Sequence, residues 1–98
     1  MNYEIKFTPD FELDLAEMDY NLIEFPQIAK QIILKIENVL LPLRNMPQIY
    51  PVYEDFPIFR KIVIEDYLLF YLIDEDKKQV EIHRLIHVKM DLKNCIKS

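Results

Sequence analysis

The chain has 98 residues, of which 51% are hydrophobic, and this length predicts a single domain over residues 1–98 with one small core. The formal net charge of −5 argues against broad, non-specific binding of nucleic acids. The chain contains no glycine. Phosphate-binding loops of the P-loop and dinucleotide types need glycine for close backbone approach, so these functions are excluded and no cofactor is expected.

No stretch reaches the roughly twenty apolar residues of a membrane helix, and the first residues lack the layout of a signal peptide. We therefore expect a cytoplasmic protein that does not enter a membrane. Cys95 is the only cysteine, which rules out an internal disulfide. Its position near the C-terminus does not by itself indicate a nucleophile.

The first half of the chain predicts a strand and two helices. Residues 3–7 alternate apolar and charged side chains, as a half-buried strand does. Thr8 and Pro9 then fit the cap and first turn of a helix. An apolar stripe follows at helical spacing, formed by Phe11, Leu15, Met18 and Leu22. Acidic residues of the same helix, namely Asp14, Glu17 and Glu24, are expected on a solvated face.

A second, more hydrophobic helix is expected from Pro26 to about Pro42, which sits late in it and ends or kinks it. The break between the helices is so short that they should form an antiparallel hairpin. Four prolines then occur between residues 42 and 57, in a connection whose apolar residues should pack against the domain.

Three strands are expected in the second half, over residues 59–64, 67–73 and 80–87. The middle one is apolar on both faces, which predicts a central position covered on both sides. In the last strand Val80, Ile82 and Ile86 should share one face, and His83, Leu85 and His87 the other. The predicted fold class is α+β: an N-terminal strand, an antiparallel helix hairpin and a three-stranded antiparallel meander, with one sheet packed on the helices. A short helical tail from about Met90 is also expected.

Charge is unevenly distributed along the chain. Residues 1–24 contain one Lys and seven acidic residues, whereas residues 77–98 contain six basic residues and two acidic ones. The basic end could meet an acidic partner or a phosphate backbone, or it could be ordinary solvated surface. Charge alone does not decide between these interpretations.

A set of polar residues lies on adjacent predicted strands or just beyond a strand end: Arg60, Arg84, His87, Lys89 and Asp91. In RNA cleavage His87 or Lys89 could act as acid or base, while Arg60 and Arg84 could hold the phosphate. Alternatively, Arg84 and Asp91 form a surface ion pair and His87 satisfies backbone groups. His83 and His87 are four residues apart on a strand, about 13 Å, which is too far for one metal ion. No metal site is expected.

The chain resembles toxins of the RelE/ParE superfamily along nearly its whole length. The resemblance rests on residues 59–64, on Tyr67 to Asp74 and on residues 80–92. It also includes the opening of residues 3–9 with Asp14-Leu15, and the spacing of apolar residues from Ala29 to Pro47. Each motif is weak alone, but their order in a chain of the expected size is not a chance match. The fold of that superfamily agrees with the fold predicted above.

The superfamily contains two activities. RelE-like members cleave mRNA on the ribosome and often carry Arg where this chain has Leu68, and a basic residue where it has Met90. The ending His87-x-x-Met90-Asp91-Leu92 resembles instead that of ParE-like toxins, which inhibit DNA gyrase without being enzymes.

The resemblance therefore implies a ParE-like toxin of a type II toxin–antitoxin module, neutralised by a cognate antitoxin. Partner contacts are expected at Arg60, Arg84, His87, Lys89 and Lys93. A ribosome-dependent mRNA endonuclease, with the ribosome and mRNA as partners and His87 and Lys89 in acid–base roles, is the first alternative. A family member that binds an antitoxin but poisons nothing is the second.

Overall fold

The computed structural model describes residues 2–89, and its elements follow the predicted order. Strand β1 (Glu4–Phe7) leads into helices α1 (Pro9–Asn21) and α2 (Pro26–Leu43). A short 3-10 turn, η1 (Pro47–Ile49), precedes strands β2 (Arg60–Ile64), β3 (Tyr67–Asp74) and β4 (Gln79–His87). The predicted tail from Met90 lies outside the described residues.

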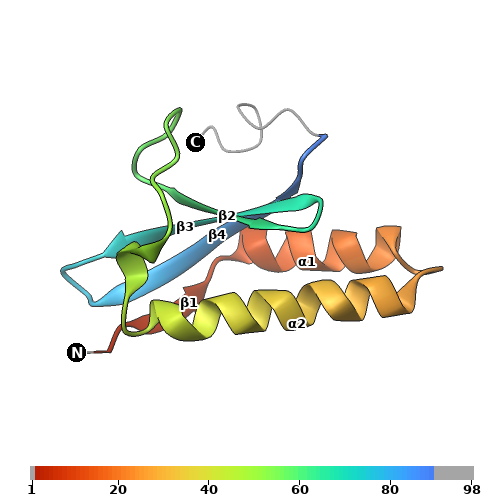
Figure 1. The fold of residues 1–98 in the computed structure, drawn as a ribbon, viewed down its shortest axis with the longest axis horizontal. Coiled ribbons are helices and arrows are strands. Elements are labelled where there is room, and N and C mark those ends of the chain that lie inside the picture. The colour runs from red at the N-terminus through yellow and green to blue at the C-terminus, as the bar shows by residue number, and fades with distance from the viewer. Residues whose placement is uncertain (1, 90–98) are drawn as a thin grey trace.

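The four strands form one sheet in the order β1-β4-β3-β2. Strands β2, β3 and β4 make the predicted antiparallel meander, and β1 pairs with β4 in parallel. Figure 1 shows α1 and α2 side by side and antiparallel on one side of the sheet, with the segment between η1 and β2 on the other. The α+β prediction is confirmed.

The ends of the elements obey local chemistry. Thr8 caps α1 as predicted, because its Oγ1 accepts a hydrogen bond of 3.1 Å from the amide of Phe11. Pro9 and Pro26 occupy the starts of the two helices. The turns before β3 and β4 place Glu65 and Lys78 at φ of 53° and 52°. Since the chain has no glycine, these residues adopt the left-handed conformation that glycine usually takes.

The sheet is buried on both faces, as the apolar β3 predicted. The larger core lies between the sheet and the helices and includes Phe11, Met18 and Tyr71. A second, smaller apolar cluster lies on the opposite face, where Tyr53 from the proline-rich connection covers Leu68, Phe70 and Ile86. The connection therefore packs against the domain, as expected.

Strand β4 departs from the predicted alternation because it contains a bulge. Phe70 pairs with Arg84 and Tyr71 with Ile82, so His83 has no partner in the β3–β4 ladder. Beyond the bulge the faces exchange: Leu85 joins Val80 and Ile82 in the main core, and Ile86 packs in the second cluster. The prediction that Ile86 shares a face with Val80, and that His83 shares one with Leu85, was wrong.

Tyr71 offers a test of this packing. Its buried hydroxyl donates a hydrogen bond of 2.6 Å to the carbonyl of Pro47 and so ties η1 to β3. Burial raises the pKa of Tyr71 to about 12, although the charge of Arg60 acts to lower it. We expect Tyr71→Phe to reduce the free energy of unfolding by about 1–3 kcal/mol at neutral pH, because the buried carbonyl loses its donor.

The hydroxyl of Tyr71 also makes the stability of the fold depend on pH in the alkaline range. Because the folded pKa is raised, the stabilisation from Tyr71 is complete below about pH 10 and is lost as pH rises toward about 12. Urea unfolding followed by circular dichroism from neutral to alkaline pH should show a smaller alkaline loss in Tyr71→Phe than in the wild type. Tyr20→Phe, which removes an exposed hydroxyl, is the control. It should change neither the free energy of unfolding at neutral pH nor the loss of stability at alkaline pH.

Candidate functional site

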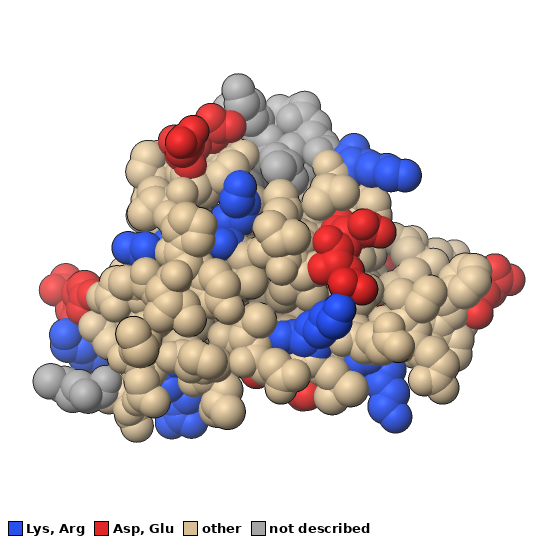
Figure 2. Space-filling model, viewed as in Figure 1, with Lys and Arg blue, Asp and Glu red and all other residues tan. Residues whose placement is uncertain are grey.

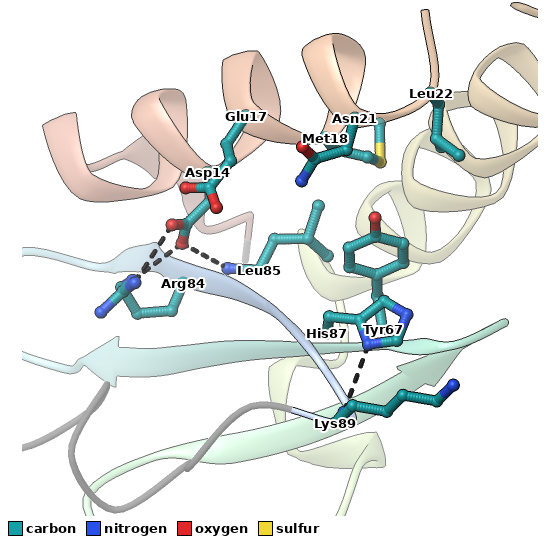
Figure 3. Close-up of a pocket in the computed structure, with 10 residues that line it drawn as sticks. All are labelled: Asp14, Glu17, Met18, Asn21, Leu22, Tyr67, Arg84, Leu85, His87 and Lys89. Carbon is teal, nitrogen blue, oxygen red and sulfur yellow. Dashed lines mark hydrogen bonds and ion pairs between the residues drawn. The ribbon is translucent and has the colours of Figure 1, made fainter. Parts of the chain in front are cut away.

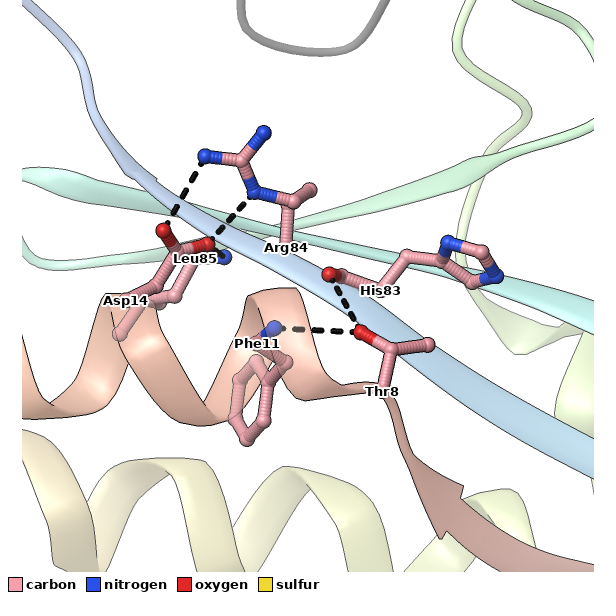
Figure 4. A network of polar contacts seen from close by, with 6 residues as sticks. All are labelled: Thr8, Phe11, Asp14, His83, Arg84 and Leu85. Carbon is pink, nitrogen blue, oxygen red and sulfur yellow. Dashed lines mark hydrogen bonds and ion pairs between the residues drawn. The ribbon is translucent and has the colours of Figure 1, made fainter. Parts of the chain in front are cut away.

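Helix α1 covers an edge of β4 that no strand occupies. Strand β1 is short and its last pair joins Phe7 to Ile82, so the edge of β4 would be open beyond that point. The amide of Thr8 donates to the carbonyl of Ile82 at 3.1 Å, and Thr8 Oγ1 donates to the carbonyl of His83 at 2.9 Å. Further along, the amide of Leu85 donates to Asp14 Oδ2 at 2.8 Å. Figure 4 shows that side chains of α1 thus replace the missing strand.

The Asp14 carboxylate also binds Arg84. Arg84 Nε donates to Oδ2 at 2.7 Å, and Nη2 donates to Oδ1 at 3.1 Å, which is a bidentate pair. The side chain of Asp14 is only 11% exposed and that of Arg84 22%. The prediction that Asp14 is part of a solvated face was wrong, whereas Glu17 and Glu24 are exposed as predicted. The alternative of an Arg84–Asp91 pair concerns a residue outside the described range.

A groove of about 500 Å³ lies between α1 and the C-terminal end of β4. Its apolar lining comes from Met18, Leu22, Tyr67 and Leu85. Polar side chains complete the lining, namely Asp14, Glu17, Asn21, Arg84, His87 and Lys89. Figure 3 shows the acidic residues and Asn21 on the helix wall, with His87 and Lys89 on the strand wall.

The geometry around His87 determines where its proton lies. The His87 ring meets the ring of Tyr67 edge-on, with centroids 5.1 Å apart. The amide of Lys89 donates to His87 Nδ1 at 3.2 Å, so neutral His87 carries its proton on Nε2. Burial, followed by the charges of Asp66 and Glu17, raises the pKa of the Tyr67 hydroxyl. This wall of the groove therefore presents the Tyr67 hydroxyl and His87 Nε2 beside the side chain of Lys89.

The structure brings together three of the five residues predicted from sequence. Arg84, His87 and Lys89 line the groove. Arg60 does not, because it pairs with Tyr71 in the sheet and donates to the carbonyl of Tyr50 at 2.7 Å. Lys93 lies outside the described residues.

The two histidines do not share a face either. His83 packs edge-on against Phe59, which belongs with the second apolar cluster, whereas His87 packs on Tyr67 of the main core. Within residues 2–89 no group of three or more His, Cys, Asp or Glu side chains is arranged to hold a metal ion. In the same range no helix is both long and apolar enough to cross a membrane.

Sequence reasoning missed the other seven residues of the groove, of which Asp14, Glu17, Asn21 and Tyr67 carry polar groups. Asp14 and Asn21 are polar residues of a surface helix, and Tyr67 belongs to an apolar strand, so none of them stands out. The resemblance includes both Tyr67 and Asp14-Leu15, but it does not indicate that Asp14 has a partner 70 residues away.

Comparisons with known proteins agree with this geometry. Residues 5–92 match the family model for the ParE toxin of type II toxin–antitoxin systems, parDE. One similar solved structure is from a chromosomal ParDE system of P. aeruginosa, with a TM-score of 0.71 and 18% identity, covering 87% of this chain and 95% of that one.

Two further structures have the same fold. A RelBE toxin–antitoxin complex of Mycobacterium tuberculosis has a TM-score of 0.64 and 22% identity, covering 89% of this chain and 99% of the other. The DinJ–YafQ toxin–antitoxin complex of E. coli has a TM-score of 0.58 and 15% identity, covering 100% of both chains. No curated protein matches the sequence.

Asp14 is the residue whose removal should most disturb this region. Asp14→Ala leaves the guanidinium of Arg84 and the amide of Leu85 without this acceptor, and we expect it to cost about 2 kcal/mol of folding free energy. Asp14→Asn retains one acceptor oxygen and should cost less. Urea denaturation midpoints measure the effect.

Asp19→Ala is the matched control, since Asp19 is an exposed carboxylate of the same helix. If Asp14→Ala and Asp19→Ala unfold at the same urea concentration, Asp14 does not hold α1 against β4.

Proposed function

Because the chain belongs to the ParE toxin family of type II toxin–antitoxin systems, we propose that it inhibits growth by acting on DNA gyrase and that a cognate antitoxin neutralises it. The family match extends over residues 5–92, which is nearly the whole chain. Gyrase is preferred to the ribosome as the target because of one observation at Leu68.

Leu68 stands where RelE-like ribonucleases often carry Arg on the central strand. Here it is 8% exposed and packs with Tyr53, Phe70 and Ile86 in the second apolar cluster. A guanidinium at that position would have to contact RNA through this apolar layer. The local chemistry favours a protein that does not use this face of the sheet for phosphate transfer.

The distribution of cations supports the same choice. RNA cleavage passes through a negatively charged phosphorane, which several positive groups around one point must stabilise. Here Arg60 lies outside the groove and Arg84 is bound to Asp14. Lys77 and Lys78 precede β4 and Lys89 follows it, so they are separated by a nine-residue strand about 30 Å long. On the face seen in Figure 2, acidic and basic side chains are interspersed and form no continuous basic patch.

An antitoxin is the partner that this family match favours, and the three solved structures described above come from toxin–antitoxin systems. In our proposal its acidic side chains meet Lys89, Arg84 and Lys93 near the end of β4. The groove beside these cations has an apolar lining, which suits an amphipathic helix or an extended segment.

The ribonuclease alternative has its own support, because Arg84, His87 and Lys89 do line one groove. Two assays with the purified protein discriminate between the targets. We expect the protein to inhibit DNA supercoiling by gyrase and to leave mRNA intact in a translating extract. Cleaved mRNA with normal supercoiling would identify a ribosome-dependent endonuclease and reject our proposal.

Induced expression in cells tests the toxin assignment itself. We expect growth arrest on expression of this chain alone and normal growth when the adjoining gene is expressed with it. Harmless expression of a folded protein would favour the second alternative, a family member that binds an antitoxin without poisoning the cell.

Lys89→Glu tests the antitoxin contact. We expect it to weaken the complex with the protein encoded next to this one by about tenfold, or 1.4 kcal/mol, because a cation facing acidic groups becomes repulsive. The measurement is a titration at two salt concentrations, and the loss should shrink at high salt. Lys77→Glu, at the other end of β4, should leave the affinity unchanged; equal losses in both variants would show a general charge effect.

A further inference from the structure

Helix α1 has a second apolar stripe that faces solvent. Its core stripe, which includes Phe11 and Met18, packs against the sheet and α2. At 100° per residue, Leu13, Ala16 and Tyr20 lie together on the opposite side. All three are exposed, with Leu13 at 67% and Tyr20 at 76%. A helix with one covered face usually carries polar residues on the other, and Leu13 and Tyr20 depart from this pattern.

The stripe continues into the turn after the helix. Ile23 is 71% exposed and Phe25 is 55% exposed. Next to Ile23, a hollow of about 420 Å³ opens between α1 and α2, lined mainly by apolar residues that include Leu22, Ala29 and Ile33. An apolar side chain of a partner would fit into this hollow beside the stripe.

Acidic side chains border this stripe along both flanks. Glu17 lies on the flank toward β4, where it lines the groove described above. Glu12 and Asp19 lie on the other flank, and Asp19 lines the hollow beside α2. Among the described residues, no ion pair involves these three carboxylates or Glu24 in the turn.

Residues 9–24 contain no Lys, Arg or His at all. Their charge excludes two occupants. A second copy of this chain would bring the same acidic flanks together, and an acidic segment would be repelled. Lys30 lines the hollow beside Asp19, and Arg84 and Lys89 line the groove with Glu17.

We propose that the outer face of α1, defined by Leu13, Ala16, Tyr20 and Ile23, docks a basic amphipathic helix of a partner protein. Apolar side chains of that helix at i, i+3 and i+7 cover the stripe, and its Lys or Arg residues pair with Glu12, Glu17 and Asp19. This surface adjoins the groove at the cationic end of β4 and shares Glu17 with it, but the charged residues of its flanks are all acidic. The inference does not depend on whether gyrase is the target.

The test uses the purified full chain and a labelled helical peptide of about 14 residues made of Leu and Lys at amphipathic spacing. A matched peptide with Glu in place of Lys is the second probe. Fluorescence anisotropy should show binding of the Lys peptide alone, weakening as salt rises from about 50 to about 300 mM. Comparable binding of the Glu peptide would overturn the proposal.

Two sets of variants locate the binding. Leu13→Ser with Tyr20→Ser removes the large apolar side chains of the stripe, and Glu17→Lys with Asp19→Lys reverses the charge of the flanks. Each pair should lower the affinity for the Lys peptide at least about tenfold. Leu34→Ser and Glu37→Lys make matched changes at exposed positions of α2 and should leave binding intact. Equal losses in the α2 controls would reject the α1 face as the site.

Folding and self-association are checked in the same samples. All four α1 positions are exposed, so thermal unfolding of the variants should match the wild type. The charge pair keeps the apolar stripe and therefore tests the proposal even if the serine pair fails to fold. A dimer detected by light scattering and dispersed by the serine pair would assign the face to a second copy and overturn the proposal.

Discussion

The contact of Asp14 with the edge of β4 is the interaction on which the arrangement of the site depends. Strand β1 covers β4 only as far as Ile82, and beyond it the backbone amide of Leu85 needs an acceptor. One carboxylate oxygen supplies it, and the same group holds Arg84. The axis of α1 is thereby fixed along β4, which creates the groove on one side of the helix and exposes the apolar stripe with its acidic flanks on another.

The bulge at His83 determines which side chains of β4 face α1. With regular alternation, Leu85 and His87 would face away from the helices. Because His83 is unpaired in the ladder, Leu85 and His87 instead turn toward α1, and Ile86 turns to the second cluster. One extra residue thus decides which side chains line the groove and which lie beneath Tyr53.

Most elements could be predicted because their causes are local. The Thr8 cap, the prolines that begin the helices and the apolar spacing of α1 and α2 each involve residues within a few positions of one another. Asp14 could not be assigned in this way, since its partners are 70 and 71 residues distant and a carboxylate on a surface helix normally faces water. Arg60 lies apart from the groove for a related reason: strands of one sheet do not bring all their residues to the same end of it.

The acidic front and basic back of the sequence also have a different meaning in three dimensions. Asp14 and Arg84 pair across the two halves, so part of the asymmetry cancels inside the structure. What persists is separated in space: within residues 2–89, carboxylates without an ion pair lie along the outer side of α1, and Lys89 lies beyond the end of β4. A chain with a net charge of −5 can therefore offer an anionic and a cationic surface at once, because each is shaped by which residues the Asp14 contact leaves exposed. Two partners of opposite charge would not compete electrostatically for the same surface, and this makes separate docking on the two sides of α1 physically consistent.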